Sequence, residues 1–269
     1  MNELNEKQKK LQNILCDMGS VAVAFSAGVD STYLLKVARN TLGDNVVAFT
    51  AATDTFPDKE LAETEEFCRS ENIRMIKIRA DVFSIDGFRS NRHDRCYHCK
   101  KELFCLIKRA ALEQGITNVI EGSNLDDAGD YRPGMRAISE LGVRSPLKEA
   151  GLTKNDIRTL SKELGLKTWD KPSFACLATR IAYGEDITVE KIAMIGEAEE
   201  YIASLGFRQY RVRLHDGEGR IELPPEDIER FLSGEVRENV RDRLHALGFK
   251  FVSLDLDGYR TGSMNAMLG

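Results

Sequence analysis

Short, uninterrupted hydrophobic runs alternate with segments of helical spacing along roughly the first 120 residues of the chain. One such run covers residues 21–25 (Val-Ala-Val-Ala-Phe), and further strands are predicted at 46–50, around 75–78 and at 118–121. Short apolar runs of this kind are typical of strands that are buried on both faces of a parallel sheet. Apolar residues recur every three to four positions in the segments between them, which predicts helices over 1–18, 30–42, 57–70 and 100–114.

This alternation of strands and helices predicts an α/β fold built on a doubly wound parallel sheet. Ligands of such sheets bind outside the carboxyl ends of the strands. Residues 122–151 carry five glycines and two prolines. We therefore expect this segment to form active-site loops around a short helix.

The pattern changes in the second half of the chain. Thr153 and Thr188 are expected to cap the N-termini of two helices, and residues 171–186 are loop-like. The remaining residues predict a compact α+β unit, with strands at 209–214, 220–223 and 251–256, a helix from Pro225 and another helix that ends at Leu247. The chain is therefore predicted to contain two domains, residues 1–170 and a smaller C-terminal domain, residues 171–269.

Composition narrows the class of protein. The chain is 42% hydrophobic and 30% charged, with a net charge of −5. An acidic chain is not expected to coat nucleic acid or an anionic membrane through general attraction. The charged start, MNELNEKQKK, does not resemble a secretory signal, and no apolar run approaches the ~18 residues of a membrane span. We expect a cytoplasmic protein without nucleic-acid or membrane partners.

The six cysteines fall into two groups. A disulfide framework is not expected in a cytoplasmic chain. Three cysteines lie in apolar, helix-like stretches, where buried bystander thiols are expected: Cys16, Cys68 and Cys105. The other three are candidates for chemistry: Cys96 and Cys99, which form a CxxC motif, and Cys176, in a segment flanked by Pro and Ser.

Residues 26–31 (Ser-Ala-Gly-Val-Asp-Ser), which we call the phosphate loop, connect a predicted strand to a predicted helix. Such a turn directs backbone N–H groups and a helix N-terminus at one point, which suits an anion. Ser26 and Ser31 add hydroxyl donors, and Gly28 permits close backbone approach. Asp30 opens the helix, and a simple capped turn is the structural alternative. The lysine of a Walker-type loop is absent.

The phosphate loop resembles the SGGxDS signature of the PP-loop (N-type ATP pyrophosphatase) superfamily, whose fold is adenine nucleotide alpha hydrolase-like. These enzymes cleave ATP between the α and β phosphates and adenylate a substrate. Ala27 replaces a glycine of the signature and is expected to keep φ negative. The resemblance implies Mg²⁺ at the phosphates, a catalytic role for Asp30, and ATP contacts from Ala24, Ser26, Gly28, Val29, Asp30, Ser31, Thr50 and Gly122.

Almost the whole chain resembles the LarE family, the sulfur-inserting enzymes of nickel-pincer nucleotide biosynthesis. The matching stretches are 95–100, 121–124, 144–147, 171–180, 211–213, 221–222 and 254–265. The resemblance implies an ATP-dependent sulfurtransferase that adenylates a carboxylate of a pyridinium biscarboxylic acid mononucleotide and converts it into a thiocarboxylate. It also implies a homo-oligomer. The substrate-binding residues would be Tyr97, Arg180, Arg211, Arg213, Glu222 and Arg260.

Cys176 is the expected catalytic nucleophile, since a thiolate displaces AMP readily from an acyl-adenylate. Arg180, four residues later, is predicted to lower the pKa of this thiol or to hold a phosphate. Arg211 and Arg213 face the same side of a strand and would form a fork for the phosphate, unless that face is merely solvated. Arg260 is a further phosphate candidate or an ordinary surface arginine.

Two sources of sulfur are consistent with the cysteines. Cys176 alone would surrender its own sulfur and become dehydroalanine. Together with Cys96 and Cys99 it would hold a [4Fe–4S] cluster with one open iron, which could carry an extra sulfide. The CxxC motif alternatively forms a redox pair or persulfide relay, a zinc site completed by His93 or His98, or a helix-start feature. Tyr97 would stack on the pyridinium ring or serve in packing.

Two rival functions follow from the same loop. One is a tRNA-modifying or amide-forming PP-loop enzyme. This rival needs RNA binding or ammonia delivery, and we identify neither a basic RNA-binding module nor a fused glutaminase domain in the sequence. The other is a non-enzymatic, nucleotide-binding regulatory protein.

Overall fold

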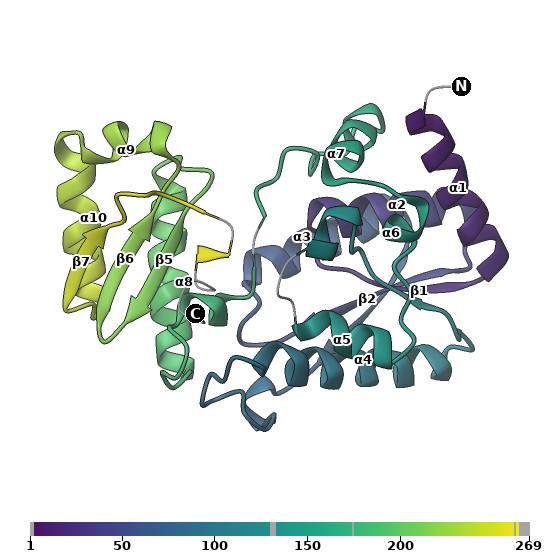
Figure 1. Ribbon diagram of the computed structural model, residues 1–269, viewed down its shortest axis with the longest axis horizontal. Coiled ribbons are helices and arrows are strands. Elements are labelled where there is room, and N and C mark those ends of the chain that lie inside the picture. The colour runs from purple at the N-terminus through teal and green to yellow at the C-terminus, as the bar shows by residue number, and fades with distance from the viewer. Residues whose placement is uncertain (1–2, 130–132, 174, 261, 264–269) are drawn as a thin grey trace. The chain divides into compact units, whose positions relative to one another are not determined.

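The computed structural model describes residues 3–129, 133–173, 175–260 and 262–263 (Figure 1). It divides into two compact units. Unit 1 comprises residues 1–81 and 96–174, and unit 2 comprises residues 82–95 and 175–269. The segment 82–95 thus joins the C-terminal part of the chain, which nothing in its sequence indicated. The functional domains 1–170 and 171–269 stay a prediction.

Unit 1 is built on a four-stranded sheet in the order β3-β2-β1-β4, in which every pairing is parallel. This arrangement confirms the predicted α/β fold. The elements are α1 (Glu3–Met18), β1 (Val21–Ala24), α2 (Val29–Leu42), β2 (Val46–Ala52), α3 (Asp58–Ser70), β3 (Arg74–Arg79), α4 (Arg95–Glu113), β4 (Val119–Ile120), η2 (Leu125–Gly129), α5 (Pro133–Glu140), α6 (Pro146–Ala150) and α7 (Lys154–Glu163).

Both faces of this sheet are covered by helices (Figure 1), which explains why its inner strands are apolar at successive positions. In β1, Val21 and Val23 belong to one hydrophobic cluster and Ala22 to the other, as the alternation of side chains along a strand requires. The first cluster includes buried residues of α1, α2, α3, α6 and α7, and the second includes those of α4 and α5.

The order of the strands creates a switch point between β1 and β4. The chain proceeds from β1 outward through β2 to β3, and then returns to place β4 on the other side of β1. The phosphate loop after β1 and the loop after β4 therefore leave neighbouring strands at the same edge. A Cβ atom at Gly122 would lie 3.0 Å from the backbone nitrogen of Ser31, so this close approach favours glycine.

Unit 2 contains a three-stranded sheet in the order β5-β6-β7, with β5 antiparallel and β7 parallel to β6. In this register Arg211 is paired with Glu222, and Arg213 with Arg220. The elements are η1 (Val82–Ser84), η3 (Leu177–Arg180), α8 (Val189–Ser204), β5 (Arg211–His215), β6 (Glu218–Glu222), α9 (Pro225–Leu232), α10 (Gly234–Leu247) and β7 (Phe251–Leu254).

Both predicted helix caps are confirmed. The Thr153 side chain accepts a hydrogen bond from the backbone N–H of Asp156, whose own side chain accepts one from the Thr153 N–H, which makes a complete capping box. Thr188 accepts in the same way from the N–H of Lys191. These signals were legible in the sequence because a cap depends on residues only three positions apart.

Three local expectations were wrong. α4 begins at Arg95 rather than near residue 100, so the CxxC motif lies within its first two turns. Cys16 and Cys105 are exposed, because each follows a buried residue of its helix by one position and points about 100° away from it. Cys68 is buried as expected, and burial raises the pKa of its thiol to about 12.

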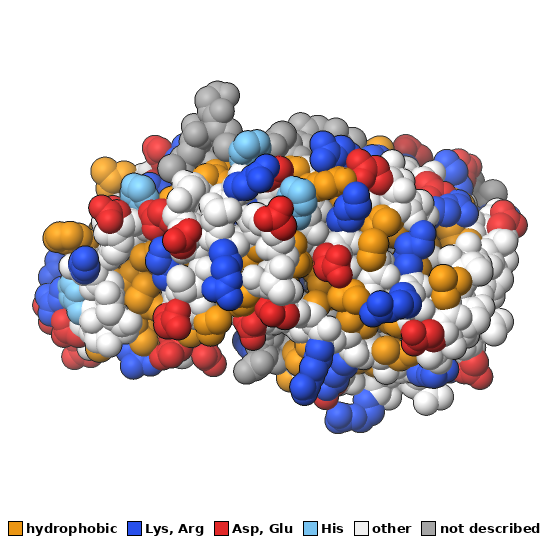
Figure 2. All heavy atoms as spheres, turned by 90° about the horizontal axis from the view of Figure 1, so that it is seen from below, with side chains coloured by type: hydrophobic (Ala, Val, Ile, Leu, Met, Phe, Trp, Pro, Cys, Tyr) orange, Lys and Arg blue, Asp and Glu red, His pale blue; other side chains and the backbone are white. Residues whose placement is uncertain are grey.

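Among the described residues, no helix combines the length and the apolar character that a bilayer crossing requires. On the face shown in Figure 2, Lys and Arg side chains are interspersed with Asp and Glu side chains. Four residues of the stretches that resemble the LarE family lie outside the described residues: Phe174, Thr261, Met264 and Asn265.

Candidate functional site

The phosphate loop lies at the switch point of the unit 1 sheet, between β1 and α2. The hydroxyl oxygens of Ser26 and Ser31 are 3.2 Å apart, and the Ser31 hydroxyl donates to the Gly28 carbonyl at 3.3 Å. Thr50, in β2, donates to the Phe25 carbonyl at 2.9 Å and so holds the start of the loop. The loop thus gathers two hydroxyl groups and the N-terminus of a 14-residue helix at one point.

Ala27 does not keep the negative φ that we expected. Its φ is +52°, in the left-handed region, and its side chain is 2% exposed. This conformation costs an alanine on the order of 1 kcal/mol, because Cβ approaches the following carbonyl oxygen, whereas glycine adopts it freely. The substitution of glycine by alanine in the loop signature therefore carries backbone strain.

Replacing Ala27 with glycine is expected to stabilise unit 1 by up to about 1 kcal/mol, because the relief of strain exceeds the extra entropy of glycine in the unfolded chain. The change is measured as a shift in the midpoint of urea unfolding, with hydrogen exchange of α2 as the probe. Gly43→Ala is the matched reverse variant, because Gly43 also has a positive φ, +60°. This substitution is expected to destabilise unit 1. A lower midpoint for Ala27→Gly would contradict the strain argument.

Asp30 is not a simple helix cap. The N-cap residue of α2 is Gly28, and no side chain caps this end of the helix. The Asp30 carboxylate instead accepts from the Lys154 ammonium at 2.5 Å and from the Asn124 amide at 3.3 Å. Asn124 follows β4 and Lys154 begins α7, so the switch point joins three separate segments of the chain at this carboxylate.

Two lysines from distant segments contact the phosphate loop and its first helix turn, although the loop has no lysine of its own. One is Lys154, on Asp30. The other is Lys171, whose ammonium donates to the Ala27 carbonyl at 3.1 Å and to the Glu63 carboxylate at 2.6 Å. Neither role was predicted from the sequence. Lys171 at least lies in a stretch that resembles the LarE family, whereas nothing local distinguishes Lys154.

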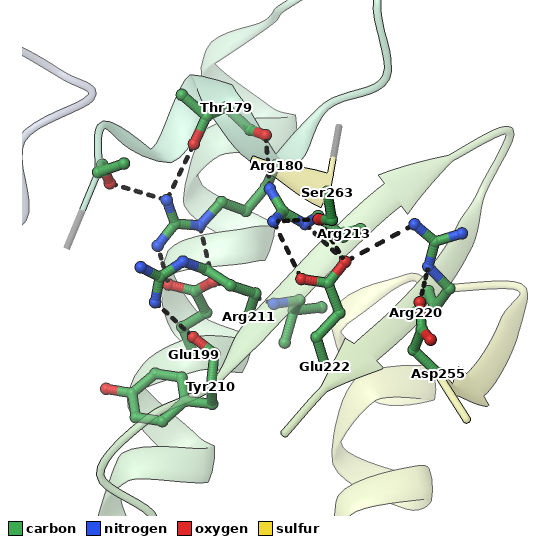
Figure 3. Close-up of polar contacts among 12 residues, drawn as sticks. Thr179, Arg180, Glu199, Tyr210, Arg211, Arg213, Arg220, Glu222, Asp255 and Ser263 are labelled. Atoms are coloured by element: carbon green, nitrogen blue, oxygen red, sulfur yellow. Dashed lines mark hydrogen bonds and ion pairs between the residues drawn. The ribbon is translucent and has the colours of Figure 1, made fainter. Parts of the chain in front are cut away.

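Unit 2 contains a buried cluster of charged residues, which we call the arginine cluster: Arg180, Arg211, Arg213, Glu199 and Glu222 (Figure 3). Arg180 forms a bidentate pair with Glu199 at 2.8 and 2.9 Å. Arg213 forms another with Glu222 at 3.0 and 2.9 Å. Arg211 and Arg213 are 4% and 7% exposed, so the alternative of a solvated strand face is wrong.

The arginine cluster holds three guanidinium groups and two carboxylates, an excess of one positive charge within its members. Arg211 experiences this excess directly. Burial, followed by the charge of Arg180, lowers the pKa of Arg211 to about 10. Arg211 also donates to the Tyr210 carbonyl at 2.6 Å (Figure 3). A buried site with surplus positive charge favours an anion, which would restore neutrality.

Glu199 was not predicted as a site residue, although its position in the sequence carried a signal. On α8 the buried residues Ile192, Ile195 and Ile202 mark one face, and Glu199 lies on that same face. A carboxylate on an apolar helix face must be paired to be tolerated. Its second role is to accept from the backbone N–H of Val212 at 3.0 Å, which fixes α8 to β5.

A cavity of about 390 Å³ adjoins the arginine cluster through Arg213. Its lining includes Arg220, Arg260, Asp255 and Ser263, and it is within the size range of small-molecule sites. Ser263 accepts from Arg213 at 3.0 Å and donates to Glu222 at 3.1 Å, so the cavity lining is hydrogen-bonded to the cluster (Figure 3). Arg260 is exposed and pairs with Asp257 at 2.9 Å.

Arg180 also supports the backbone around Cys176. Its guanidinium donates to the carbonyls of Ala175 and Cys176 at 2.8 and 3.3 Å and to the hydroxyl of Thr179 at 3.0 Å. Cys176 itself is exposed and immediately precedes η3. The structure thus places Arg180 against the main chain of the predicted nucleophile and against Glu199.

Cys96 and Cys99 lie three residues apart near the start of α4, on the same side of the helix, and both are half-buried. They belong to unit 1 and Cys176 to unit 2. Within the described ranges no three His, Cys, Asp or Glu side chains are gathered as a metal site. That the three cysteines meet stays a prediction. Arg95, which directly precedes Cys96, donates to the Ala178 carbonyl at 3.0 Å within unit 2.

Tyr97 is buried and engaged on several sides. The Arg136 guanidinium lies 3.9 Å from the centroid of its ring. Its hydroxyl donates to Glu140 at 2.6 Å and accepts from Lys101 at 3.0 Å. The hydrogen bond from Tyr97, followed by the charges of Lys101 and Arg136, lowers the pKa of Glu140. These contacts give Tyr97 a packing role, and stacking on a pyridinium ring stays a prediction.

Comparison with known proteins decides the family. No family model matches the chain. The chain is 39% identical to an uncharacterized protein of Synechocystis sp., over 98% of its own length and 99% of that protein. It is 27% identical to an uncharacterized protein of Methanocaldococcus jannaschii, over 97% of its own length and 95% of that protein. It is also 39% identical, over its whole length, to the pyridinium-3,5-bisthiocarboxylic acid mononucleotide synthase of Lactiplantibacillus plantarum, covering 97% of that protein. The chain belongs to the LarE family.

In this LarE-family chain the predicted site residues form two groups. The phosphate loop, Thr50 and Gly122 lie at the switch point of unit 1. The predicted substrate residues Arg180, Arg211, Arg213 and Glu222 lie together in the arginine cluster of unit 2, with Arg260 on the adjoining cavity. Tyr97 belongs to unit 1.

Proposed function

We propose that this protein is an ATP-dependent sulfurtransferase. It adenylates a carboxylate of a pyridinium biscarboxylic acid mononucleotide, releases pyrophosphate and converts the acyl-adenylate to a thiocarboxylate. The observation that carries the proposal is a lysine-free phosphate loop at the switch point of a chain that is similar over its full length to the bisthiocarboxylic acid mononucleotide synthase of L. plantarum.

The phosphate loop supports the adenylation step. The N-terminus of α2 and the hydroxyls of Ser26 and Ser31 would bind the phosphates of ATP. Mg²⁺ prefers carboxylate oxygens, and the Asp30 carboxylate at the start of α2 fits this need. Bound Mg²⁺ would neutralise charge as pyrophosphate leaves. In the first step a substrate carboxylate oxygen attacks the α phosphorus, and the bond between the α and β phosphates breaks.

The arginine cluster supports binding of a nucleotide monophosphate. Its surplus positive charge lies in a buried setting, and Arg213 lines the adjoining cavity. A phosphate that carries one to two negative charges would offset that surplus. The paired carboxylates of Glu199 and Glu222 would hold the guanidinium groups in fixed positions, so that little ordering is needed when the phosphate binds.

The sulfur comes either from Cys176 itself or from a cluster-bound sulfide. In the first case the Cys176 thiolate attacks the acyl carbon and AMP leaves. The bond between Cβ and Sγ of Cys176 then breaks with loss of the Cα proton, which leaves dehydroalanine. In the second case Cys96, Cys99 and Cys176 would hold a [4Fe–4S] cluster, which supplies a transferable sulfide when bound. The two half-buried thiols of the CxxC motif fit two of these ligand positions.

The test is to incubate the protein with ATP, Mg²⁺ and the pyridinium biscarboxylic acid mononucleotide. AMP, pyrophosphate and a product in which sulfur replaces one carboxylate oxygen are expected, measured by a coupled pyrophosphate assay and mass spectrometry. Asp30→Asn is expected to reduce pyrophosphate release at least a hundredfold, because a carboxylate at the phosphates is lost. Asp44→Asn, an exposed control, should leave release unchanged. ADP instead of AMP as the product would overturn the proposal.

A further inference from the structure

The main chain around Cys176 is held largely by side chains. Cys176 is exposed and precedes η3, a turn of only four residues. On its N-terminal side, the Arg180 guanidinium donates to the carbonyls of Ala175 and Cys176 at 2.8 and 3.3 Å. A segment outside long helices and sheet ladders must find other partners for its backbone polar groups. The position of the Cys176 thiol therefore depends on the side chains that bind these carbonyls.

Two buried residues from a distant part of the chain hold the segment on the C-terminal side of Cys176. Asn91 is 0% exposed, and its amide nitrogen donates to the carbonyls of Ile181 and Ala182 at 3.1 and 2.7 Å. Arg95 is 4% exposed and donates to the Ala178 carbonyl at 3.0 Å. Its guanidinium also donates to the side-chain oxygen of Asn91. We call Asn91 and Arg95 the backbone clamp.

The backbone of Asn91 shows that its side chain is the reason for its presence. Its φ is +48°, in the left-handed region, where asparagine is tolerated but glycine is less strained. The Asn91 carbonyl accepts from the N–H of Gly184 at 3.2 Å, so main chain and side chain both bind the segment after η3. Glycine would satisfy the backbone here, but it would leave the carbonyls of Ile181 and Ala182 without the amide donor. The clamp thus fastens residues 82–95 to the Cys176 segment within unit 2.

Sulfur transfer explains why this segment needs to be rigid. Capture of an acyl-adenylate requires the reacting sulfur within about 3–3.5 Å of the acyl carbon, and a displacement of about 1 Å costs up to ~100-fold in rate. Cys176 is exposed, so water competes with sulfur. In that side reaction the water oxygen bonds to the acyl carbon, the bond from this carbon to the AMP oxygen breaks, and a proton is released. The carboxylate is regenerated and the ATP is wasted.

We propose that Asn91 and Arg95 are positioning residues for sulfur transfer, which fix the main chain that carries Cys176 so that sulfur rather than water captures the acyl-adenylate. Neither side chain touches the substrate in this proposal. Both sources of sulfur require the Sγ atom of Cys176, so the clamp serves either one. The proposal rests on the proposed sulfurtransferase function and adds two residues to it.

The experiment measures thiocarboxylate formed per pyrophosphate released, at saturating ATP and mononucleotide, on the full chain and on Asn91→Gly. Glycine keeps the positive φ and deletes the amide. The ratio is expected to fall about tenfold, because the thiol is no longer held in place. A loss of folded protein lowers both products together and leaves the ratio unchanged. The ratio therefore separates a positioning role from a merely structural one.

The matched control is Asn72→Gly. Asn72 has nearly the same φ, +51°, but it is exposed and belongs to unit 1. This variant should keep the wild-type ratio. Hydrogen exchange of residues 177–182 should accelerate in Asn91→Gly, whereas peptides of α8 should exchange as in the wild type, which reports that unit 2 is folded.

Variants of Arg95 test the clamp independently. Arg95→Met should lower the ratio as Asn91→Gly does. Arg95→Lys keeps the charge but loses the planar guanidinium, and it should give an intermediate ratio. If Asn91→Gly also loosens α8, the comparison of Arg95→Lys with Arg95→Met decides. A wild-type ratio in Arg95→Met, or in a folded Asn91→Gly, overturns the proposal.

The outcomes separate this proposal from the proposed function. If the wild-type chain forms pyrophosphate and thiocarboxylate and the clamp variants keep the same ratio, only the positioning role is wrong. If the wild-type chain releases no pyrophosphate with the mononucleotide, or releases it without forming thiocarboxylate, the proposed function fails and the positioning role fails with it.

Discussion

Replacing Cys176 with alanine is expected to abolish thiocarboxylate formation while pyrophosphate release continues. Both sources of sulfur require the Sγ atom of Cys176, either as the atom transferred or as a ligand of the cluster. Adenylation instead uses the phosphate loop of unit 1, to which Cys176 does not belong. The product is measured by mass spectrometry, and pyrophosphate by a coupled assay.

The matched control is Cys105→Ala, because Cys105 is also exposed and lies outside the predicted site. It should retain the wild-type yield of thiocarboxylate. Product formed by Cys176→Ala at the wild-type rate would remove Cys176 from the mechanism. Simultaneous loss of pyrophosphate release would show that the two steps are not separable in the way we propose.

The sulfur source is decided by iron content and by Cys99→Ser. If a cluster supplies the sulfide, anaerobically purified protein should contain about four irons per chain, and Cys99→Ser should lose both the iron and the product. If Cys176 is the donor, Cys99→Ser should still form one product per chain. The wild-type protein should then lose the mass of hydrogen sulfide in proportion to product. Absence of iron after anaerobic reconstitution would exclude the cluster route.

Arg180→Met is expected to destabilise unit 2 by about 3–5 kcal/mol, because it leaves the buried carboxylate of Glu199, on α8, without its bidentate partner. Arg211→Met, in contrast, is expected to change stability by less than about 1 kcal/mol. Burial and the charge of Arg180 already disfavour the charged form of Arg211, as its lowered pKa indicates, so relief of repulsion offsets the hydrogen bond lost to Tyr210.

The chain has two compact units, and chains of this kind need not unfold in a single transition. The stability of unit 2 is therefore measured locally, by hydrogen exchange of peptides from α8 and β5. Arg180→Met should accelerate exchange there and Arg211→Met should not. Arg211→Met should nevertheless lose affinity for the substrate mononucleotide, because it removes the surplus positive charge. An equally large destabilisation by both substitutions would contradict the greater structural role that we assign to the pair of Arg180 and Glu199.

Features that depend on neighbours in sequence could be predicted from the chain alone. The apolar run of β1 specified a strand buried on both faces, and Thr153 and Thr188 specified helix caps. The phosphate loop was recognisable because six consecutive residues carry its chemistry. The resemblance to the LarE family, confirmed by the comparisons, likewise rests on contiguous stretches.

Features that depend on residues far apart in sequence could not be predicted. Lys154 and Asp30 are separated by 124 positions, and Lys171 and Ala27 by 144. The sequence predicted that Arg211 and Arg213 share a face, since strand side chains alternate. It did not predict that Glu199 pairs with Arg180 and Glu222 with Arg213.

The sequence by itself therefore determined the strands, the caps and the phosphate loop, because hydrophobic period and capping are properties of adjacent residues. Only the tertiary structure decided which charges pair, that Ala27 adopts a positive φ, and that residues 82–95 join the C-terminal unit. Each of these depends on packing between distant segments, where burial makes an unpaired charge costly and can impose a backbone conformation that the residue alone disfavours.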